Sequence, residues 1–294
     1  MWNSRDREER IEIFEDTERW IRSNAKLQAA VAGSAARQVF YPEEQEIRVI
    51  KSYANTDSER EGSVRVSRDR SFQAAEKYVR NGDRTLVLNF ASSTNPGGGV
   101  KGGSAAQEES LCRCSTLYDC LSVQKMREAF YQRHKDAHRM GQMNALHNDD
   151  CIYTPDVYVI KSDIEKPQRL PERDWYKADV ITCAAPNLRE RPSNRMNPGD
   201  GTEKVEITDA ALKDLHKKRL VRILDLAYLN HADVVILGAF GCGAFRNPPE
   251  IVSAAARETL SEYRKRFRMV EFAVFCKERD SSKYDVFRKA LEVF

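Results

Sequence analysis

Residues 86–118 read LVLNFASSTNPGGGVKGGSAAQEESLCRCSTLY, and this stretch decides the fold. Its first six residues are apolar or small except Asn89, which is typical of a buried strand. A loop with five glycines follows, and then residues 105–121 have helical composition without Gly or Pro. Glycine lets a backbone take positive φ and turn its amides toward a ligand. A strand, a glycine loop and a helix N-terminus in this order predict a site for a phosphate or diphosphate.

Two adjacent carboxylates distinguish this stretch from a simple phosphate site. Gln107, Glu108 and Glu109 open the predicted helix. Two acids in a first helical turn are often only solvent-exposed and mildly stabilising. Next to the triple glycine, however, they favour acid–base chemistry on the bound ligand.

A dinucleotide-binding fold is the competing interpretation of the same glycines. Gly97, Gly99 and Gly102 satisfy G-x-G-x-x-G. In that fold the glycines follow their strand directly and an acidic residue ends a second strand about 20 residues later. Here residues 92–96 intervene, and the region around Asp119 is predicted to be helical. The context therefore excludes this interpretation.

The rest of the chain alternates strands and helices, which predicts an α/β protein with ligand loops at the carboxyl ends of its strands. A second glycine loop, residues 238–249, follows the apolar strand 233–237, and Asn247 and Pro248 are expected to cap and begin the next helix. The other predicted helices are residues 6–31, 71–80, 209–230, 249–267 and 284–293. Other strands are predicted around Ile47 and Val49, at 151–161 entered through Pro155, at 179–182 and at 270–276. An edge strand or turn is predicted within residues 58–69. A long polar loop, 188–201, separates two of them and suggests a function or mobility.

Composition limits the partners. The chain of 294 residues carries 48 basic and 45 acidic side chains, for a net charge of +3, so neither duplex nucleic acid nor a membrane is expected as a partner. Seven cysteines without a signal peptide or a long apolar span favour a reducing cytoplasm. We expect a monomer.

No familiar metal motif is present. Cys112, Cys114 and Cys120 lack the spacing of a zinc site, and no histidine completes one. His134 and His138 are four residues apart on a predicted helix, but their polar surroundings favour a solvent-exposed face.

The motif resembles the signature of the bacterial-type (microbial) poly(ADP-ribose) glycohydrolases, which are built on a macrodomain. Three glycines, seven residues and then Gln-Glu-Glu carry the resemblance, and residues 87–91, Asn95-Pro96, 151–161 and 183–187 extend it over most of the chain. It implies a macrodomain-like three-layer α/β/α sandwich with a mixed sheet over residues 41–294. Residues 1–40 would be a helical extension packed on that core.

The resemblance also implies a reaction and a site. Glu109 would be the general acid and then the base in hydrolysis of ribose–ribose O-glycosidic bonds of poly(ADP-ribose), releasing ADP-ribose mainly from chain ends. Glu108 would hold a ribose hydroxyl. Other expected ligand contacts are Gln107, the amides of Gly97, Gly98, Gly99, Gly241, Cys242, Gly243 and Ala244 along the diphosphate and distal ribose, Phe245 against that ribose, and Asn89 or Asn95 on ribose hydroxyls.

Two alternatives stay open. One is a hydrolase acting on single ADP-ribose groups, and the other is a non-catalytic module that binds ADP-ribose. The intact Gln107-Glu108-Glu109 counts against the second. The ligands implied are ADP-ribose and poly(ADP-ribose), free or on modified proteins, with no cofactor and no metal.

Overall fold

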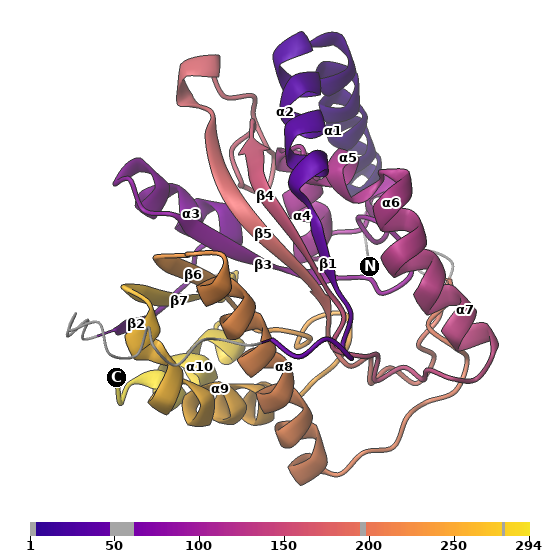
Figure 1. Cartoon of the computed structure of the whole chain (residues 1–294), viewed down its shortest axis with the longest axis vertical. Helices are drawn as coiled ribbons and strands as arrows, with labels where there is room; N and C mark the ends of the chain where they lie inside the picture. The colour runs from indigo at the N-terminus through magenta and orange to yellow at the C-terminus, as the bar shows by residue number, and fades with distance from the viewer. Residues whose placement is uncertain (1–3, 48–61, 195–197, 278–279) are drawn as a thin grey trace.

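One mixed sheet forms the centre of the molecule (Figure 1). The computed structural model describes residues 4–47, 62–194, 198–277 and 280–294. Within these described residues, seven strands lie in the order β1-β4-β5-β3-β6-β7-β2. Their bounds are β1 (Val39–Tyr41), β2 (Ser63–Ser67), β3 (Thr85–Ala91), β4 (Cys151–Val159), β5 (Tyr176–Ala184), β6 (Val234–Leu237) and β7 (Met269–Ala273). The pairs β1–β4 and β4–β5 are antiparallel and the other four are parallel.

Helices cover both faces of the sheet because alternate side chains of the buried strands point to opposite sides. Leu86 and Leu88 of β3 pack with α8 (Asp209–Leu229), α9 (Pro249–Tyr263) and α10 (Ser282–Leu291). Val87, between them, packs with α3 (Ser71–Arg80), α4 (Gln107–Cys114) and α5 (Leu117–Leu121). All three side chains are 2% exposed or less, and burying each contributes about 1.5–3 kcal/mol. The predicted three-layer sandwich with a mixed sheet is confirmed.

The topology brings the two glycine loops together. β3 and β6 are parallel neighbours, and each runs into one of the loops. Because parallel strands end at the same edge of a sheet, residues 92–106 and 238–248 leave the sheet side by side.

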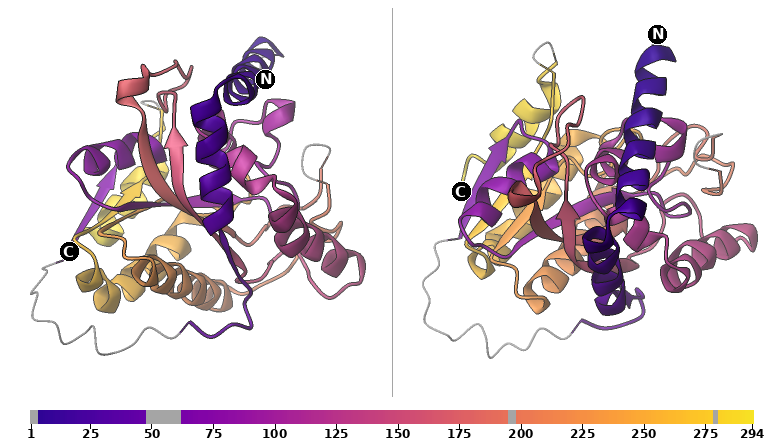
Figure 2. Two further views of the ribbon diagram at one scale, coloured as in Figure 1. Left: turned by 45° about the horizontal axis from the view of Figure 1, so that its top comes forward. Right: turned by 90° about the horizontal axis from the view of Figure 1, so that it is seen from above.

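The N-terminal segment forms two helices where the sequence predicted one over residues 6–31. They are α1 (Ser4–Ser23) and α2 (Ala25–Arg37), drawn in indigo in both views of Figure 2. Asn24 separates them because its backbone is extended and its side chain accepts hydrogen bonds from the amides of Lys26 and Leu27. The chain then enters β1, which pairs with β4. A boundary between extension and core at residue 40 falls inside this strand, and the division into 1–40 and 41–294 stays a prediction.

Three other predicted features differ from the structure. Residues 105–121 form two helices rather than one, because the hydroxyl of Ser115 accepts a hydrogen bond from the Leu117 amide and starts a new helix. Pro155 lies inside β4 rather than at its entrance, at a bulge that follows Thr154. Asn247 does not cap α9, whose N-cap is Pro248.

The remaining predictions vary in accuracy. The helix 71–80 is confirmed. Other predicted elements are present but begin or end at different residues: the helices near residues 209, 249 and 284 and the strands near 179, 233 and 270. The predicted strand at Val49 lies outside the described residues. Between α5 and β4 lie α6 (Gln124–Met126), the π-helix η3 (Arg127–Gln132) and α7 (Arg133–Arg139). No helix in the described part of the chain is long and apolar enough to cross a membrane.

Candidate active site

A cavity of about 1280 Å³ opens at the edge of the sheet where the two glycine loops meet. Its wall includes Gly98 and Gly99 of the first loop, with Glu108 and Glu109 behind them, and part of the second loop. α1 forms another side, where Arg7 and Arg10 donate hydrogen bonds to the carbonyls of Gly102 and Gly103. The position is the one that the strand order predicts for a ligand.

Glu109 lies in the first turn of α4 and is 7% exposed. Its Oε1 accepts a hydrogen bond of 2.9 Å from the Gly99 amide. Its Oε2 has no hydrogen-bond partner among the described residues, although the atom is buried. One oxygen of the carboxyl group is therefore fixed, and the other can carry a proton or meet a ligand.

Glu108 is held more tightly than Glu109. Its Oε2 accepts from the Ser92 amide at 2.7 Å, and its Oε1 accepts from Asn89 Nδ2 at 3.2 Å. Asn89 is fully buried and also bonds Thr182. Asn89 thus positions a glutamate, and its contact with ribose stays a prediction.

Burial shifts the protonation of both acids. Desolvation raises the pKa of Glu109, and it raises the pKa of Glu108 well above the usual range, assisted by the neighbouring Glu109 charge. The amides that these carboxylates accept from act in the opposite direction but do not prevail. Burial therefore moves the pKa of Glu109 in the direction that a general acid needs.

Gln107 lines the cavity, but its amide group is bonded to neighbouring protein groups, and its ligand contact stays a prediction. Its Oε1 accepts from the Phe90 amide, and its Nε2 donates to the Leu88 carbonyl and to Ser71 Oγ. The side chain connects the end of β3 to the start of α3. Its position next to the two glutamates reflects this connection.

The triple glycine differs from its predicted role. The Gly98 amide donates to the Asn95 carbonyl and the Gly99 amide to Glu109, so neither is turned toward a diphosphate. Gly97 and Gly98 have φ of 67° and 56°, which glycine adopts without strain. The loop thus shapes the carboxylate site. Asn95 bonds Thr94 and the Pro198 carbonyl, and its contact with ribose also stays a prediction.

The second glycine loop has amides that are available. Within the described chain no acceptor lies within hydrogen-bond reach of the amides of Gly243, Ala244 and Phe245, and all three residues line the cavity. Three consecutive amides of this kind attract an anion. Cys242 is buried with its thiol against the Phe240 carbonyl and lies outside the cavity wall. Gly241 lines the cavity but packs closely against Asn247.

Several cavity residues were missed by sequence reasoning. Phe90 follows Asn89 at the end of β3, Arg70 precedes α3, and Phe275 follows β7. The Arg70 guanidinium lies 4.0 Å from the centre of the Phe275 ring. Arg189 and Asn194 come from the long loop that the sequence marked as functional. No local motif carries these residues, because distant elements bring them together.

The histidines also differ from expectation. His134 is 1% exposed rather than solvent-exposed, and its ring bonds the Ser93 carbonyl and Asp150. It helps to fix the segment between β3 and the glycine loop.

Comparison with known proteins gives two results. A family model of the microbial-type PARG catalytic domain, PARG being poly(ADP-ribose) glycohydrolase, matches residues 8–162. No curated protein matches this chain in sequence.

Solved structures with the same fold are poly(ADP-ribose) glycohydrolases. The Deinococcus radiodurans enzyme in complex with ADP-ribose is 29% identical, with 90% of this chain and 97% of that chain covered and a TM-score of 0.72. The Thermomonospora curvata enzyme is 25% identical, with 96% and 98% covered and a TM-score of 0.75. The same enzyme bound to the inhibitor ADP-HPD superposes with a TM-score of 0.73, at 25% identity over 95% and 98% of the chains. Since the family model covers more than half of the sequence, this chain belongs to the microbial-type PARG catalytic domain family.

Proposed function

We propose that this protein is a poly(ADP-ribose) glycohydrolase that hydrolyses ribose–ribose O-glycosidic bonds and releases ADP-ribose, mainly from chain ends. The observation that carries the proposal is the geometry of Glu109. One of its oxygens is fixed by the Gly99 amide, and the other is buried without a hydrogen-bond partner among the described residues, in a side chain that lines the cavity. Family membership and the relatives that bind ADP-ribose or an inhibitor support the substrate class.

The chemistry follows from the two oxygens of Glu109. The protonated carboxyl group donates its proton to the oxygen that joins the two riboses, and the bond between this oxygen and the anomeric carbon breaks. The leaving ribose keeps the proton as a hydroxyl group. The carboxylate then takes a proton from the water that attacks the anomeric carbon, which restores the acid.

Glu108 and the second glycine loop would orient the substrate. The Ser92 amide and Asn89 hold the carboxyl group of Glu108 in place, where it would accept a hydrogen bond from a ribose hydroxyl. The amides of residues 243–245 would receive the diphosphate, and Phe245 would lie against the distal ribose. α1 forms a wall anchored to the glycine loop, which supports a pocket for the end of a chain.

The seven cysteines support an intracellular setting. All are free thiols, and six of them are buried. Because such thiols persist in a reducing compartment, we place the enzyme in the cytoplasm.

The test compares the parent protein with Glu109→Gln on purified poly(ADP-ribose), with calorimetric titration of ADP-ribose into both. We expect release of ADP-ribose by the parent and a loss of about 10²- to 10⁴-fold in the variant, because general acid–base catalysis contributes that much. Binding of ADP-ribose should persist, since Gln can still accept from the Gly99 amide. Glu262→Gln, an exposed acid of α9, is the matched control.

Two outcomes would redirect the assignment. Tight binding without release by either protein would indicate a binding module. Release from a mono-ADP-ribosylated protein but not from polymer would indicate the mono-ADP-ribosyl hydrolase. The length of the released products tests the preference for chain ends, because internal cleavage would yield oligomers.

A further inference from the structure

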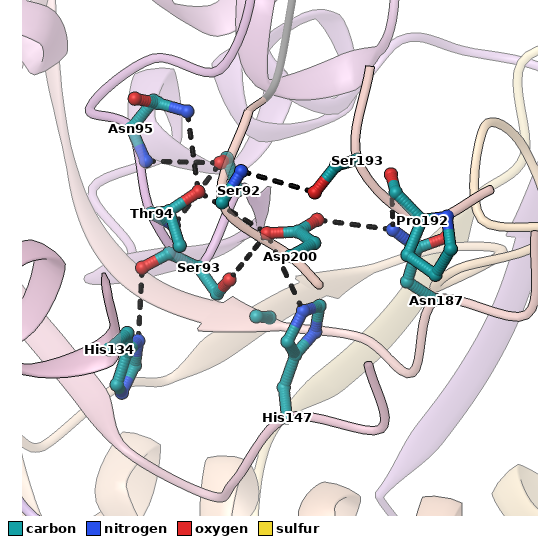
Figure 3. A network of polar contacts seen from close by, with 12 residues as sticks. Ser92, Ser93, Thr94, Asn95, His134, His147, Asn187, Pro192, Ser193 and Asp200 are labelled. Carbon is teal, nitrogen blue, oxygen red and sulfur yellow. Dashed lines mark hydrogen bonds and ion pairs between the residues drawn. The ribbon is translucent and has the colours of Figure 1, made fainter. Parts of the chain in front are cut away.

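Three metal-ligating side chains from separate segments meet outside the catalytic cavity. They are His138 in the last turn of α7, His147 in the turn before β4, and Asp200 in the loop before α8. One ring nitrogen of each histidine and one oxygen of Asp200 all lie within 4.8 Å of one another. His147 Nε2 is 3.8 Å from Asp200 Oδ1, and Figure 3 shows the two side chains facing each other.

Both histidines present a nitrogen that nothing in the described chain satisfies. His147 is 8% exposed, and its Nδ1 donates a hydrogen bond of 2.7 Å to the Ala185 carbonyl. That bond holds the ring so that Nε2 faces Asp200. Nε2 of His147 and Nε2 of His138 are both buried without a hydrogen-bond partner. Leaving such atoms unpaired costs free energy, which a bound cation would recover.

Asp200 is oriented as a ligating carboxylate usually is. Its Oδ1 accepts from Ser93 Oγ at 2.9 Å and from Thr94 Oγ1 at 3.2 Å, and its Oδ2 accepts from Asn187 at 3.1 Å. The residue is fully buried. Figure 3 shows Asp200 at the centre of these contacts. Such surrounding hydrogen bonds hold a ligand in place and tune the metal.

We propose that His138, His147 and Asp200 form a binding site for Zn²⁺. Two imidazole nitrogens and one carboxylate oxygen suit Zn²⁺, whereas Mg²⁺ prefers oxygen ligands. In a tetrahedral site with Zn–N bonds of about 2.0–2.1 Å, neighbouring ligand atoms are about 3.3 Å apart. Closing the present separation requires a shift of roughly 1.5 Å or less. His138 can supply it, because the residue is only half-buried and lies at a helix end.

The site would stabilise the wall of the catalytic cavity. Asp200 belongs to the loop that supplies Arg189 and Asn194 to that wall. The ring of His147 packs 5.9 Å from the ring of Phe245, centre to centre, behind the second glycine loop. A metal here joins the loop that carries Asp200 to α7 and to the turn before β4. Its role is structural, because the three ligands lie outside the cavity wall and are separate from Glu109.

The test measures binding of Zn²⁺ to the full chain after chelation and dialysis, by competition with a chromophoric chelator and by elemental analysis. We expect one Zn²⁺ per chain and a rise in Tm on adding it. His138→Ala and Asp200→Asn should each weaken binding by about 100-fold or more, since loss of even a surrounding partner costs 10- to 100-fold. His231→Ala, at an exposed turn after α8, should bind as the parent does.

Co²⁺ separates this site from zinc held by the free cysteines. Co²⁺ at the proposed site should give visible d–d absorption without the thiolate charge-transfer bands of a cysteine site. Failure of the parent to bind micromolar Zn²⁺, binding unchanged in His138→Ala, or thiolate bands would each overturn the proposal. Circular dichroism and ADP-ribose titration show that each variant is folded. The readout does not use hydrolysis, so this inference and the proposed activity can fail separately.

Discussion

A side chain at position 98 would interfere directly with the two carboxylates. A Cβ there would lie 2.7 Å from Glu109 Oε1 and 2.9 Å from Glu108 Oε2, closer than real contacts allow. The positive φ of Gly98 would add strain. We expect Gly98→Ala to reduce kcat for poly(ADP-ribose) by at least about 10²-fold, the lower range for losing acid–base catalysis. Steady-state kinetics measure this.

Gly82 is the control for Gly98. It also has positive φ, in the turn after α3, but a Cβ there would meet nothing within 4 Å. Gly82→Ala should therefore carry only backbone strain and keep the parent kcat. Equal kcat in both variants and the parent would show that the carboxylates do not need their present positions.

Glu109 should make the protein less stable at neutral pH than a neutral residue would. Its pKa is raised by burial, so the folded state holds the proton in a pH range where the unfolded chain has lost it. Stability therefore falls as pH rises from about 4.3, the unfolded value, through the folded pKa. Glu109→Gln does not titrate, and we expect its Tm to exceed that of the parent at pH 8.

The pH dependence of this difference is the check. Thermal unfolding between pH 3.5 and 8 should show the Tm advantage of Glu109→Gln shrinking to zero below about pH 4, where the parent carboxyl is protonated in both states. Glu108→Gln should instead have a lower Tm than the parent, because its new amide group would face either the Ser92 amide or Asn89 Nδ2, which are both hydrogen-bond donors. An advantage that persists at low pH would mean that charge burial is not its cause.

Asparagines show the limit of sequence reasoning at single residues. The sequence placed Asn89 and Asn95 near the ligand loops and predicted contacts with ribose. In the structure Asn89 orients Glu108 and Asn95 bonds Pro198, because the amide group of either residue can serve a neighbouring segment equally well. The partners of Asn89 and Asn95 include Thr182 and Pro198, which are distant in the sequence, so only the folded structure shows which partner each asparagine has.

Among the elements, α1 depends on one buried cation for its attachment. Lys161 is 2% exposed, and its ammonium contacts Asp16 at 2.8 Å and the Ile13 carbonyl at 2.9 Å. Hydrogen bonds from Arg169 and Lys161 lower the pKa of Asp16 to about 2. Asp16→Asn keeps the shape but leaves the buried charge without a counterion. We expect a loss of about 1–3 kcal/mol in the free energy of unfolding.

Urea unfolding at pH 7 measures that loss, with Glu12→Gln on the exposed face of α1 as the control. The direction in which this contribution changes with pH follows from the pKa of Asp16. Because the folded pKa of Asp16 is depressed, its contribution is present above about pH 4 and disappears as pH falls through about 2. A free energy of unfolding equal to that of Glu12→Gln would show that α1 is held by its apolar contacts alone.

Helices and strands were predicted well where an apolar periodicity defines them. They were predicted poorly where one polar group determines where an element ends or begins. α3 and β3 follow clear apolar patterns and were found within one residue. The break at Asn24 and the new helix start at Leu117 each depend on the hydrogen bonds of one side chain, and helical composition does not reveal such bonds. The position of Pro155 inside β4 depends on a bulge, which only pairing with β5 defines.

For the whole molecule, ligand binding should stabilise the fold as a unit. The cavity is lined from α1, the start of α3, both glycine loops and the segment after β7. At 100 times its Kd a ligand that binds only the folded state adds about 2.7 kcal/mol. We expect ADP-ribose to raise Tm by several degrees, and AMP or ribose 5-phosphate by less, because each fills only part of the cavity. Differential scanning fluorimetry measures the shifts, and equal shifts would contradict a site for the complete ADP-ribose molecule.

The positions of the cavity residues in the sequence also determine when, during synthesis, the protein can form its complete pocket. Ser4 and Arg7 near one end of the chain and Phe275 and Lys283 near the other share one wall of the cavity. During translation the first of these leaves the ribosome long before the last, and the intervening sheet also lacks β7 until then. A nascent chain therefore has no complete pocket until almost the entire sequence has been made.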